Sequence, residues 1–214
     1  MNSIEHHIKF TKSGRYFTHG EMSDGKELII ALHGYGHLAA FFIKKFHQID
    51  TSKYVIVCPE GLNRYYQNGT NGRVGASWMT KEDRENDIQD YITFLDTLLD
   101  HLKSECSFSK ITLVGFSQGG ATASRWLAYG HHNFDRFILW ATVFPPDMEK
   151  EYTSKFNESE NFFVFGSEDE YYSPAIVEDH FKEIQALELN FQMINFEGKH
   201  NIHQETLLNI LEDV

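Results

Sequence analysis

The chain has 214 residues, 41% of them apolar, and a formal net charge of −12 at pH 7. This length suffices for a substantial hydrophobic core, and we expect a single domain over residues 1–214. The negative charge argues against nucleic acid or anionic membranes as partners. No apolar run reaches the ~18 residues that a membrane-spanning helix needs, so we expect no integral membrane segment.

The chain begins without the basic and then apolar segments of a secretory signal, which predicts a cytoplasmic protein. The two cysteines, Cys58 and Cys106, have no spacing typical of a metal or redox site, so we expect reduced structural thiols. The acidic surface is compatible with either a monomer or a homodimer.

The first third of the chain alternates between strand and helix patterns. Residues 3–19 alternate weakly and contain turn residues, which predicts an edge hairpin. The apolar run 27–32 predicts a buried parallel strand, with a loop at its carboxyl end that begins at His33. A helix at 38–48 and a strand at 54–58 follow. Residues 63–75 predict a long polar loop, and a loop of that length is more often functional than not.

The remaining elements continue the alternation. Residues 81–103 carry apolar side chains at helical spacing and predict a helix that packs on the sheet. Pro174 suits the first turn of a later helix. The further predicted strands are 111–114, 137–141, 161–165 and 191–196, and the further predicted helices are 120–128, 174–187 and 202–213. Such alternation is typical of an α/β fold, with a mostly parallel central sheet and helices on both faces.

The stretch Gly115-Phe116-Ser117-Gln118-Gly119 joins the predicted strand at 111–114 to the helix that follows. A serine between glycines at a sharp strand-to-helix turn sits in a strained backbone conformation, which exposes its hydroxyl at the edge of the sheet. The start of the helix also provides free N–H groups and the positive end of the helix dipole. Ser117 is therefore the candidate nucleophile.

A serine hydroxyl needs a base to take its proton, and an acid that orients the base. Asp169 and His200 lie on the loops after later strands, in the order Ser, Asp, His that this architecture uses. Parallel strands bring these loops to one edge of the sheet, so we expect the three side chains to converge. The backbone N–H groups of Tyr35 and Gln118 are the candidate oxyanion donors.

Other residues compete for these roles. Glu168 and Glu170 flank Asp169, and Asp147 follows the preceding strand, so each is an alternative acid. We expect His33 to brace the loop with Tyr35 rather than to transfer protons. His203 lies three residues after His200, but no metal-binding motif accompanies the pair, so we expect no catalytic metal.

Several large side chains near the sheet edge where Ser117, Asp169 and His200 are expected to converge are candidates to line an apolar substrate pocket. Core packing explains any one of them equally well. The candidates are Phe41, Phe42, Trp78, Phe144 and Tyr171.

The chain resembles the phospholipase/carboxylesterase family of the α/β-hydrolase superfamily, which includes bacterial carboxylesterases and acyl-protein thioesterases. The resemblance covers nearly the whole chain, and the string Gly-Phe-Ser-Gln-Gly-Gly-Ala is its most specific mark. The matching segments are 32–36, 58–61, 77–78, 115–121, 166–169 and His200.

The resemblance implies an α/β-hydrolase fold without a cofactor. Short connections follow most of the predicted strands and leave little room for a large cap domain. It matches Ser117, Asp169 and His200 to the family's triad, and Tyr35 and Gln118 to its oxyanion donors. Family members commonly have a small aliphatic residue in place of Tyr35, and the bulk of this side chain, with Tyr171 and Tyr172, can reshape the acyl pocket.

We therefore expect a serine carboxylesterase that hydrolyses short- to medium-chain acyl esters through an acyl-enzyme. The substrate is then a small-molecule acyl ester. Acyl thioesterase or lysophospholipase activity by the same mechanism is an alternative. A non-catalytic ligand-binding protein on the same scaffold is an alternative from a different class, because the geometry of the site decides activity.

Overall fold

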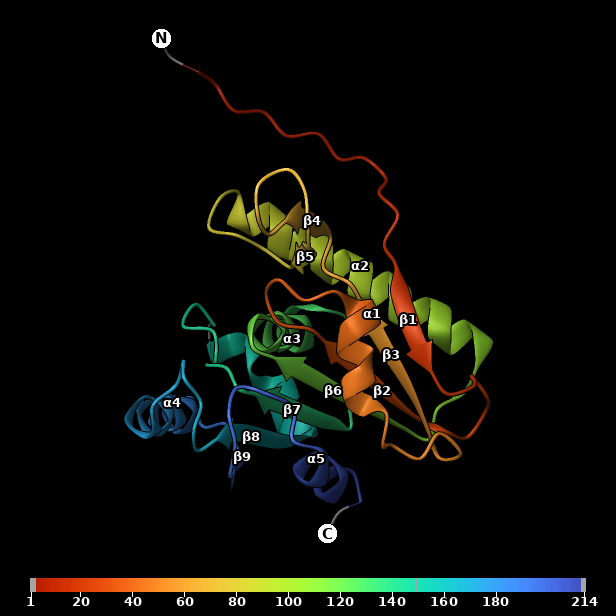
Figure 1. Cartoon of the computed structure of the whole chain (residues 1–214), viewed down its shortest axis with the longest axis vertical. Coiled ribbons are helices and arrows are strands. Elements are labelled where there is room, and N and C mark those ends of the chain that lie inside the picture. The colour runs from red at the N-terminus through yellow and green to blue at the C-terminus, as the bar shows by residue number, and fades with distance from the viewer. Residues whose placement is uncertain (1–2, 149, 213–214) are drawn as a thin grey trace.

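A seven-stranded sheet forms the centre of the computed structural model, which describes residues 3–148 and 150–212 (Figure 1). The strand order is β1-β3-β2-β6-β7-β8-β9, and only β1 runs antiparallel to its neighbour. The strands are β1 (Tyr16–His19), β2 (Glu27–Leu32), β3 (Tyr54–Pro59), β6 (Lys110–Phe116), β7 (Arg136–Trp140), β8 (Glu160–Gly166) and β9 (Phe191–Phe196).

Helices cover both faces of this sheet, which confirms the expected architecture. Alternate residues of a strand point to opposite faces. In β2, Ile30 belongs to the core cluster that includes residues of α2, α3 and α4 on one face, whereas Ile29 belongs to the cluster on the other face, with residues of α1 and α5. The helices are α1 (Ala39–Phe42), α2 (Arg84–Glu105), α3 (Gln118–Tyr129), α4 (Pro174–Ala186) and α5 (Gln204–Leu211), with 3-10 turns at Ile43–Phe46, Lys150–Tyr152 and Ser154–Glu158.

The parallel register brings the carboxyl ends of the central strands together. Leu32, the last residue of β2, lies beside Gly115 near the end of β6. Phe116 in turn lies beside Trp140, the last residue of β7. The loops that follow β2, β6 and β7 therefore begin at the same edge of the sheet, where α/β proteins commonly bind their ligands.

Two sequence-based predictions were wrong. Residues 3–15 form no regular structure, and β1 pairs with β3 instead of forming a hairpin with the segment before it. Residues 63–75 are not an irregular loop, because β4 (Asn63–Tyr66) and β5 (Val74–Ser77) form a small antiparallel sheet. In both segments the pairing partner, which local sequence does not reveal, decides the structure.

Helix boundaries also differ from the prediction, most at the first two helices. The helix expected at 38–48 is a short α1 followed by a 3-10 turn, and α2 begins at Arg84 rather than at residue 81. Among the described residues, no helix combines the length and the apolar composition that crossing a membrane requires.

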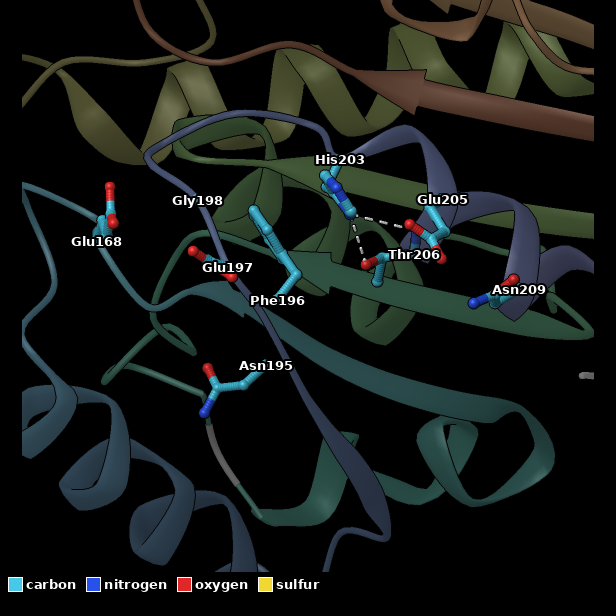
Figure 2. Close-up of a pocket in the computed structure, with 9 residues that line it drawn as sticks. All are labelled: Glu168, Asn195, Phe196, Glu197, Gly198, His203, Glu205, Thr206 and Asn209. Atoms are coloured by element: carbon cyan, nitrogen blue, oxygen red, sulfur yellow. Dashed lines mark hydrogen bonds between the residues drawn. The ribbon is translucent and has the colours of Figure 1, made fainter.

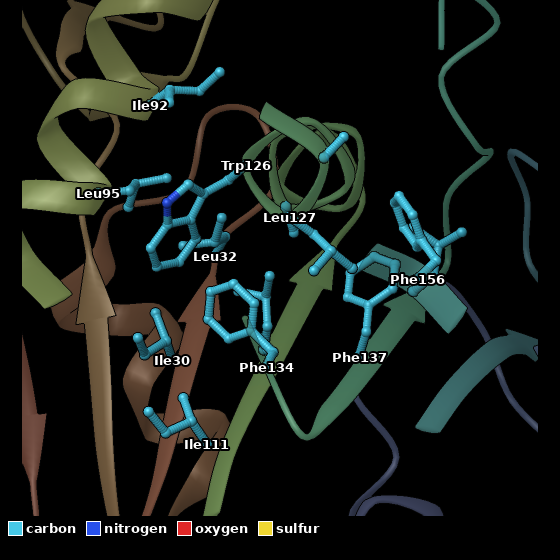
Figure 3. Close-up of a cluster of buried hydrophobic side chains, with 14 of the residues drawn as sticks. Ile30, Leu32, Ile92, Leu95, Ile111, Trp126, Leu127, Phe134, Phe137 and Phe156 are labelled. Atoms are coloured by element: carbon cyan, nitrogen blue, oxygen red, sulfur yellow. The ribbon is translucent and has the colours of Figure 1, made fainter. Parts of the chain in front are cut away.

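The larger of the two core clusters lies on the face of the sheet that α2 and α3 cover. Figure 3 shows Ile92 and Leu95 of α2 facing the Trp126 indole of α3. The indole N–H donates to the Asp96 carboxylate at 2.8 Å, which adds a polar link between the two helices. This packing fixes α3, and with it the residue that precedes α3, against the sheet.

We expect Leu95→Ala to lower the free energy of unfolding by about 2–5 kcal/mol, because Leu95 is fully buried and its truncation leaves a cavity. Gln89→Ala, on the exposed side of the same helix, is the control and changes stability by less than about 0.5 kcal/mol. Urea unfolding followed by circular dichroism measures both. Equal stabilities for the two variants would contradict this account of the core.

Candidate active site

Ser117 occupies the turn between β6 and α3 with φ 53° and ψ −126°, outside the conformations that L-residues prefer. Its N–H donates to the carbonyl of Trp140 at 3.0 Å, which holds the turn against the end of β7. Such strain persists only where the surrounding packing enforces it.

The glycines beside Ser117 permit this packing. A β-carbon at Gly119 would lie 2.2 Å from the carbonyl oxygen of Leu32, and one at Gly115 would lie 2.5 Å from the α-carbon of Gly120. Real β-carbons do not approach backbone atoms so closely. Backbone atoms of strand β6, helix α3 and the end of β2 therefore approach one another closely here, and Ser117 is held at the point of contact.

The side chains of Asp169 and His200 are hydrogen-bonded. His200 Nδ1 lies 2.8 Å from Asp169 Oδ2, and the Asp169 side chain is fully buried. The other carboxylate oxygen accepts the backbone N–H groups of Tyr171 and Tyr172, at 2.9 and 3.3 Å. With both oxygens occupied, the carboxylate has one orientation, and the bond to Nδ1 leaves His200 Nε2 free to act as a base.

The His200 ring lies next to the serine turn. Its centroid is 4.9 Å from that of Phe116, the residue before Ser117, and 4.7 Å from the exposed ring of Tyr171. The structure therefore brings together the loops that carry Ser117, Asp169 and His200.

The alternative acids have other contacts. Asp147 lies 2.6 Å from a guanidinium nitrogen of Arg84 and 2.6 Å from one of Arg125. Burial acts to raise the pKa of Asp147, but hydrogen bonds from Arg125 and Arg84 outweigh it and hold the pKa at about 2. Glu170 accepts the backbone N–H of His200, at 3.5 Å. Of the candidate acids, Asp169 is the one whose carboxylate contacts the His200 ring.

Glu168 and His203 face a polar hollow of about 590 Å³ beside β9. Figure 2 shows the His203 ring directed toward Thr206 at the start of α5. Its Nδ1 lies 2.9 Å from Thr206 Oγ1, and the ring stacks on Phe196 at 5.0 Å. His203 thus caps α5, and no residue of the loop after β2, which carries Tyr35, lines this hollow.

The loop after β2 passes directly over the serine. A β-carbon at Gly34 would lie 3.0 Å from Ser117 Cβ, so the backbone of this loop lies close to the nucleophile candidate. Within the described part of the chain, the next N–H group, that of Tyr35, donates to no backbone acceptor. Gln118 is the first residue of α3, so its N–H has no acceptor within the helix. Both candidate donors are therefore free to bind an oxyanion.

His33 braces this loop from below. It is fully buried, its Nε2 accepts the Gly61 N–H at 2.9 Å, and its Nδ1 donates to the Gly34 carbonyl at 2.8 Å. Its own carbonyl accepts the Trp78 indole N–H at 2.8 Å. Burial lowers the pKa of His33 from 6.5 to about 4, so the ring is neutral at pH 7.

The Gln118 side chain also has a structural role that the sequence did not reveal. Its Oε1 accepts the Trp78 N–H at 3.1 Å, and its Nε2 donates to the Met79 carbonyl at 2.8 Å. The residue that presents one candidate oxyanion donor therefore also holds the segment after β5.

The β4–β5 hairpin supports the same loop from its other side. The Gly36 N–H donates to the Ala76 carbonyl at 2.9 Å, and the Ala76 N–H donates to the His37 carbonyl at 3.1 Å. Gln67 Nε2 donates to the Gly36 carbonyl at 2.7 Å, and the Tyr35 and Tyr65 rings lie 5.4 Å apart. This hairpin, which was predicted as a loop, belongs to the site.

The candidate wall residues are not all in one place. Phe41 and Phe42 line a cavity of about 250 Å³ beside the loop 33–38 that follows β2, called the Tyr35 loop below. Tyr171 lies over His200. Trp78 is buried beneath the loop and packs against His33. Phe144 was expected at the pocket but packs in the core against Phe156 and Phe191, because the chain turns inward after β7.

The sequence model of the phospholipase/carboxylesterase family matches residues 18–214. No individual curated protein sequence is significantly similar to the chain.

Similar solved structures show a shared fold at low sequence identity. Esterase PE8 is 20% identical, with a TM-score of 0.69 over 95% of this chain and 100% of that one. Acyl-protein thioesterase 2 of Zea mays is 16% identical, with a TM-score of 0.71 over 94% and 97% of the two chains. The carboxylesterase of Bacillus cereus is 16% identical, with a TM-score of 0.65 over 93% and 92%.

The low pKa of His33 predicts acid sensitivity. The unfolded chain protonates this side chain near pH 6.5, whereas the folded chain does so only near pH 4. Between these values the unfolded state binds more protons, so the stabilisation is complete above pH 6.5 and is lost as the pH falls toward 4. The loss between pH 7 and pH 5 is about 2 kcal/mol.

Urea unfolding of the wild type and of His33→Gln at both pH values measures this contribution. We expect the variant to be less stable at pH 7 but to lose about 2 kcal/mol less than the wild type on going to pH 5. The same loss in both proteins would contradict a neutral, buried His33.

Proposed function

The chain belongs to the phospholipase/carboxylesterase family, and from this premise we propose that it is a serine carboxylesterase acting through an acyl-enzyme. The observation that carries the proposal is the 2.8 Å hydrogen bond between Asp169 and His200, with the His200 ring against the residue before Ser117. In residues 3–148 and 150–212 the α/β-hydrolase fold carries no large cap over this site.

In the proposed reaction, His200 Nε2 takes the proton of the Ser117 hydroxyl as the oxygen attacks the ester carbonyl. The N–H groups of Tyr35 and Gln118 stabilise the negative charge on the carbonyl oxygen. His200 then protonates the leaving alcohol, which yields the acyl-enzyme. A water molecule, deprotonated by His200, releases the acid and restores Ser117.

Asp169 keeps the His200 ring oriented through both half-reactions and stabilises its positive charge. Its burial and its bonds from the two tyrosine N–H groups support this role, since an acid with a fixed orientation needs no rearrangement during the reaction.

The size of the nearby cavity supports short to medium acyl chains. About 250 Å³ between the Tyr35 loop, α1 and β5 is small compared with the ligand sites of ~300–1,000 Å³ that hold drug-sized molecules. Thioesters of similar size are the second candidate, because the same nucleophile and oxyanion donors serve both bonds and the family includes both activities.

We expect the wild type to hydrolyse p-nitrophenyl esters, with a maximum rate between acetate and octanoate and a much lower rate on palmitate. Ser117→Ala abolishes this activity. Asp169→Asn lowers kcat by about 10³–10⁴, because it no longer selects the reactive tautomer of His200.

Ser124→Ala is the matched control, since Ser124 lies on α3, the helix that follows Ser117, is fully buried and donates to the Gly120 carbonyl. It retains wild-type activity. Equal rates for the wild type and Ser117→Ala would reject the esterase proposal and favour the non-catalytic alternative, whereas a preference for matched thioesters would identify a thioesterase.

A further inference from the structure

The cavity of about 250 Å³ beside the Tyr35 loop combines apolar walls with positive charge. Leu38, Phe41, Phe42 and Val74 supply apolar surface, and Lys45 and Arg73 supply two cations. Within the described part of the chain, no aspartate or glutamate lines it. These are unusual surroundings in a protein whose net charge is −12.

The cavity adjoins the proposed reaction centre. Its lining includes Gly36 and His37, which directly follow Tyr35. The His37 ring stacks on that of Phe116, with centroids 5.9 Å apart and planes at 10°, and Phe116 contacts His200. The cavity therefore adjoins the loop that carries Tyr35 and lies two ring contacts from His200. From this proximity we infer that one arm of a short ester at Ser117 reaches it.

Arg73 differs from the other arginines of the chain. Each of the others lies within ion-pair distance of a carboxylate; these are Arg15, Arg64, Arg84, Arg125 and Arg136. No carboxylate in the described residues pairs with Arg73, whose guanidinium keeps all its donors available.

Lys45 is similarly available to an anion. Its ammonium donates to the Asn201 side-chain oxygen at 2.6 Å, a neutral partner that leaves its charge uncompensated. Burial lowers the pKa of His37, and the positive charges of Lys45, His200 and Arg73 lower it further. These effects favour the neutral form of the His37 ring, and the two cations make the cavity electropositive.

We propose that this cavity binds a carboxylate carried by the substrate, so that the preferred substrates are short esters with a free carboxylate on one arm. The inference rests on the proposed esterase function and assigns its substrate class. Arg73 and Lys45 bind the carboxylate, since guanidinium and ammonium groups form strong charge-assisted hydrogen bonds to it. The apolar walls accommodate the methylene groups between the carboxylate and the ester.

Two pairs of esters that differ only in a methyl or carboxylate terminus test the proposal. Monomethyl glutarate is compared with methyl pentanoate, which places the carboxylate on the acyl arm. 4-Acetoxybutanoate is compared with butyl acetate, which places it on the alcohol arm. Acid release in a pH-stat at pH 7.5 gives kcat/KM for all four.

We expect the wild type to prefer the anionic member of at least one pair by about tenfold or more, through a lower KM. Arg73→Gln reduces this preference by about five- to tenfold, Lys45→Met reduces it as well, and added salt weakens it. Lys81→Gln, which removes one exposed positive charge outside the cavity, leaves the preference unchanged.

The outcomes separate this inference from the esterase proposal. Turnover of the neutral esters without preference for the anionic ones, or a preference that Arg73→Gln leaves intact, would overturn the carboxylate site alone. Absence of turnover of any ester, including p-nitrophenyl esters, would overturn both.

Discussion

The close approach of the backbones of β6, α3 and the end of β2 at Gly115 and Gly119 is the constraint on which the site depends. Gly119 lies too close to the Leu32 carbonyl for any side chain, and this approach keeps Ser117 at a positive φ. The strain is offset by the helix packing behind it, where Trp126 and α2 hold α3 on the sheet. The packing of the core thus determines where the serine hydroxyl lies.

A second layer of hydrogen bonds makes the loops around Ser117 depend on one another. Neutral His33 links the loop after β2 to Gly61, and Trp78 bonds both to the His33 carbonyl and to the Gln118 side chain. The candidate oxyanion donors at residues 35 and 118 therefore belong to one network. Such preorganised donors stabilise a transition state without having to rearrange.

Sequence alone predicted the elements that are determined by residues close together in the chain. The apolar runs indicated the buried parallel strands, and the glycines around Ser117 indicated the turn. It did not predict the β4–β5 hairpin, which is held by hydrogen bonds to residues 36 and 37. Because this hairpin places Arg73 at the cavity, the sequence did not reveal that position either. Phe144 was misplaced because the chain turns after β7 at Ala141, where φ is 48° and the residue type gives no such indication.

The measurement that tests the central claim most directly is mass spectrometry of the protein after brief treatment with a fluorophosphonate. A serine activated by His200 and Asp169 forms one covalent adduct, which we expect on Ser117 in the tryptic peptide 111–125 and not on the buried Ser124 of the same peptide. An unmodified Ser117, in a protein shown to be folded, would contradict the account.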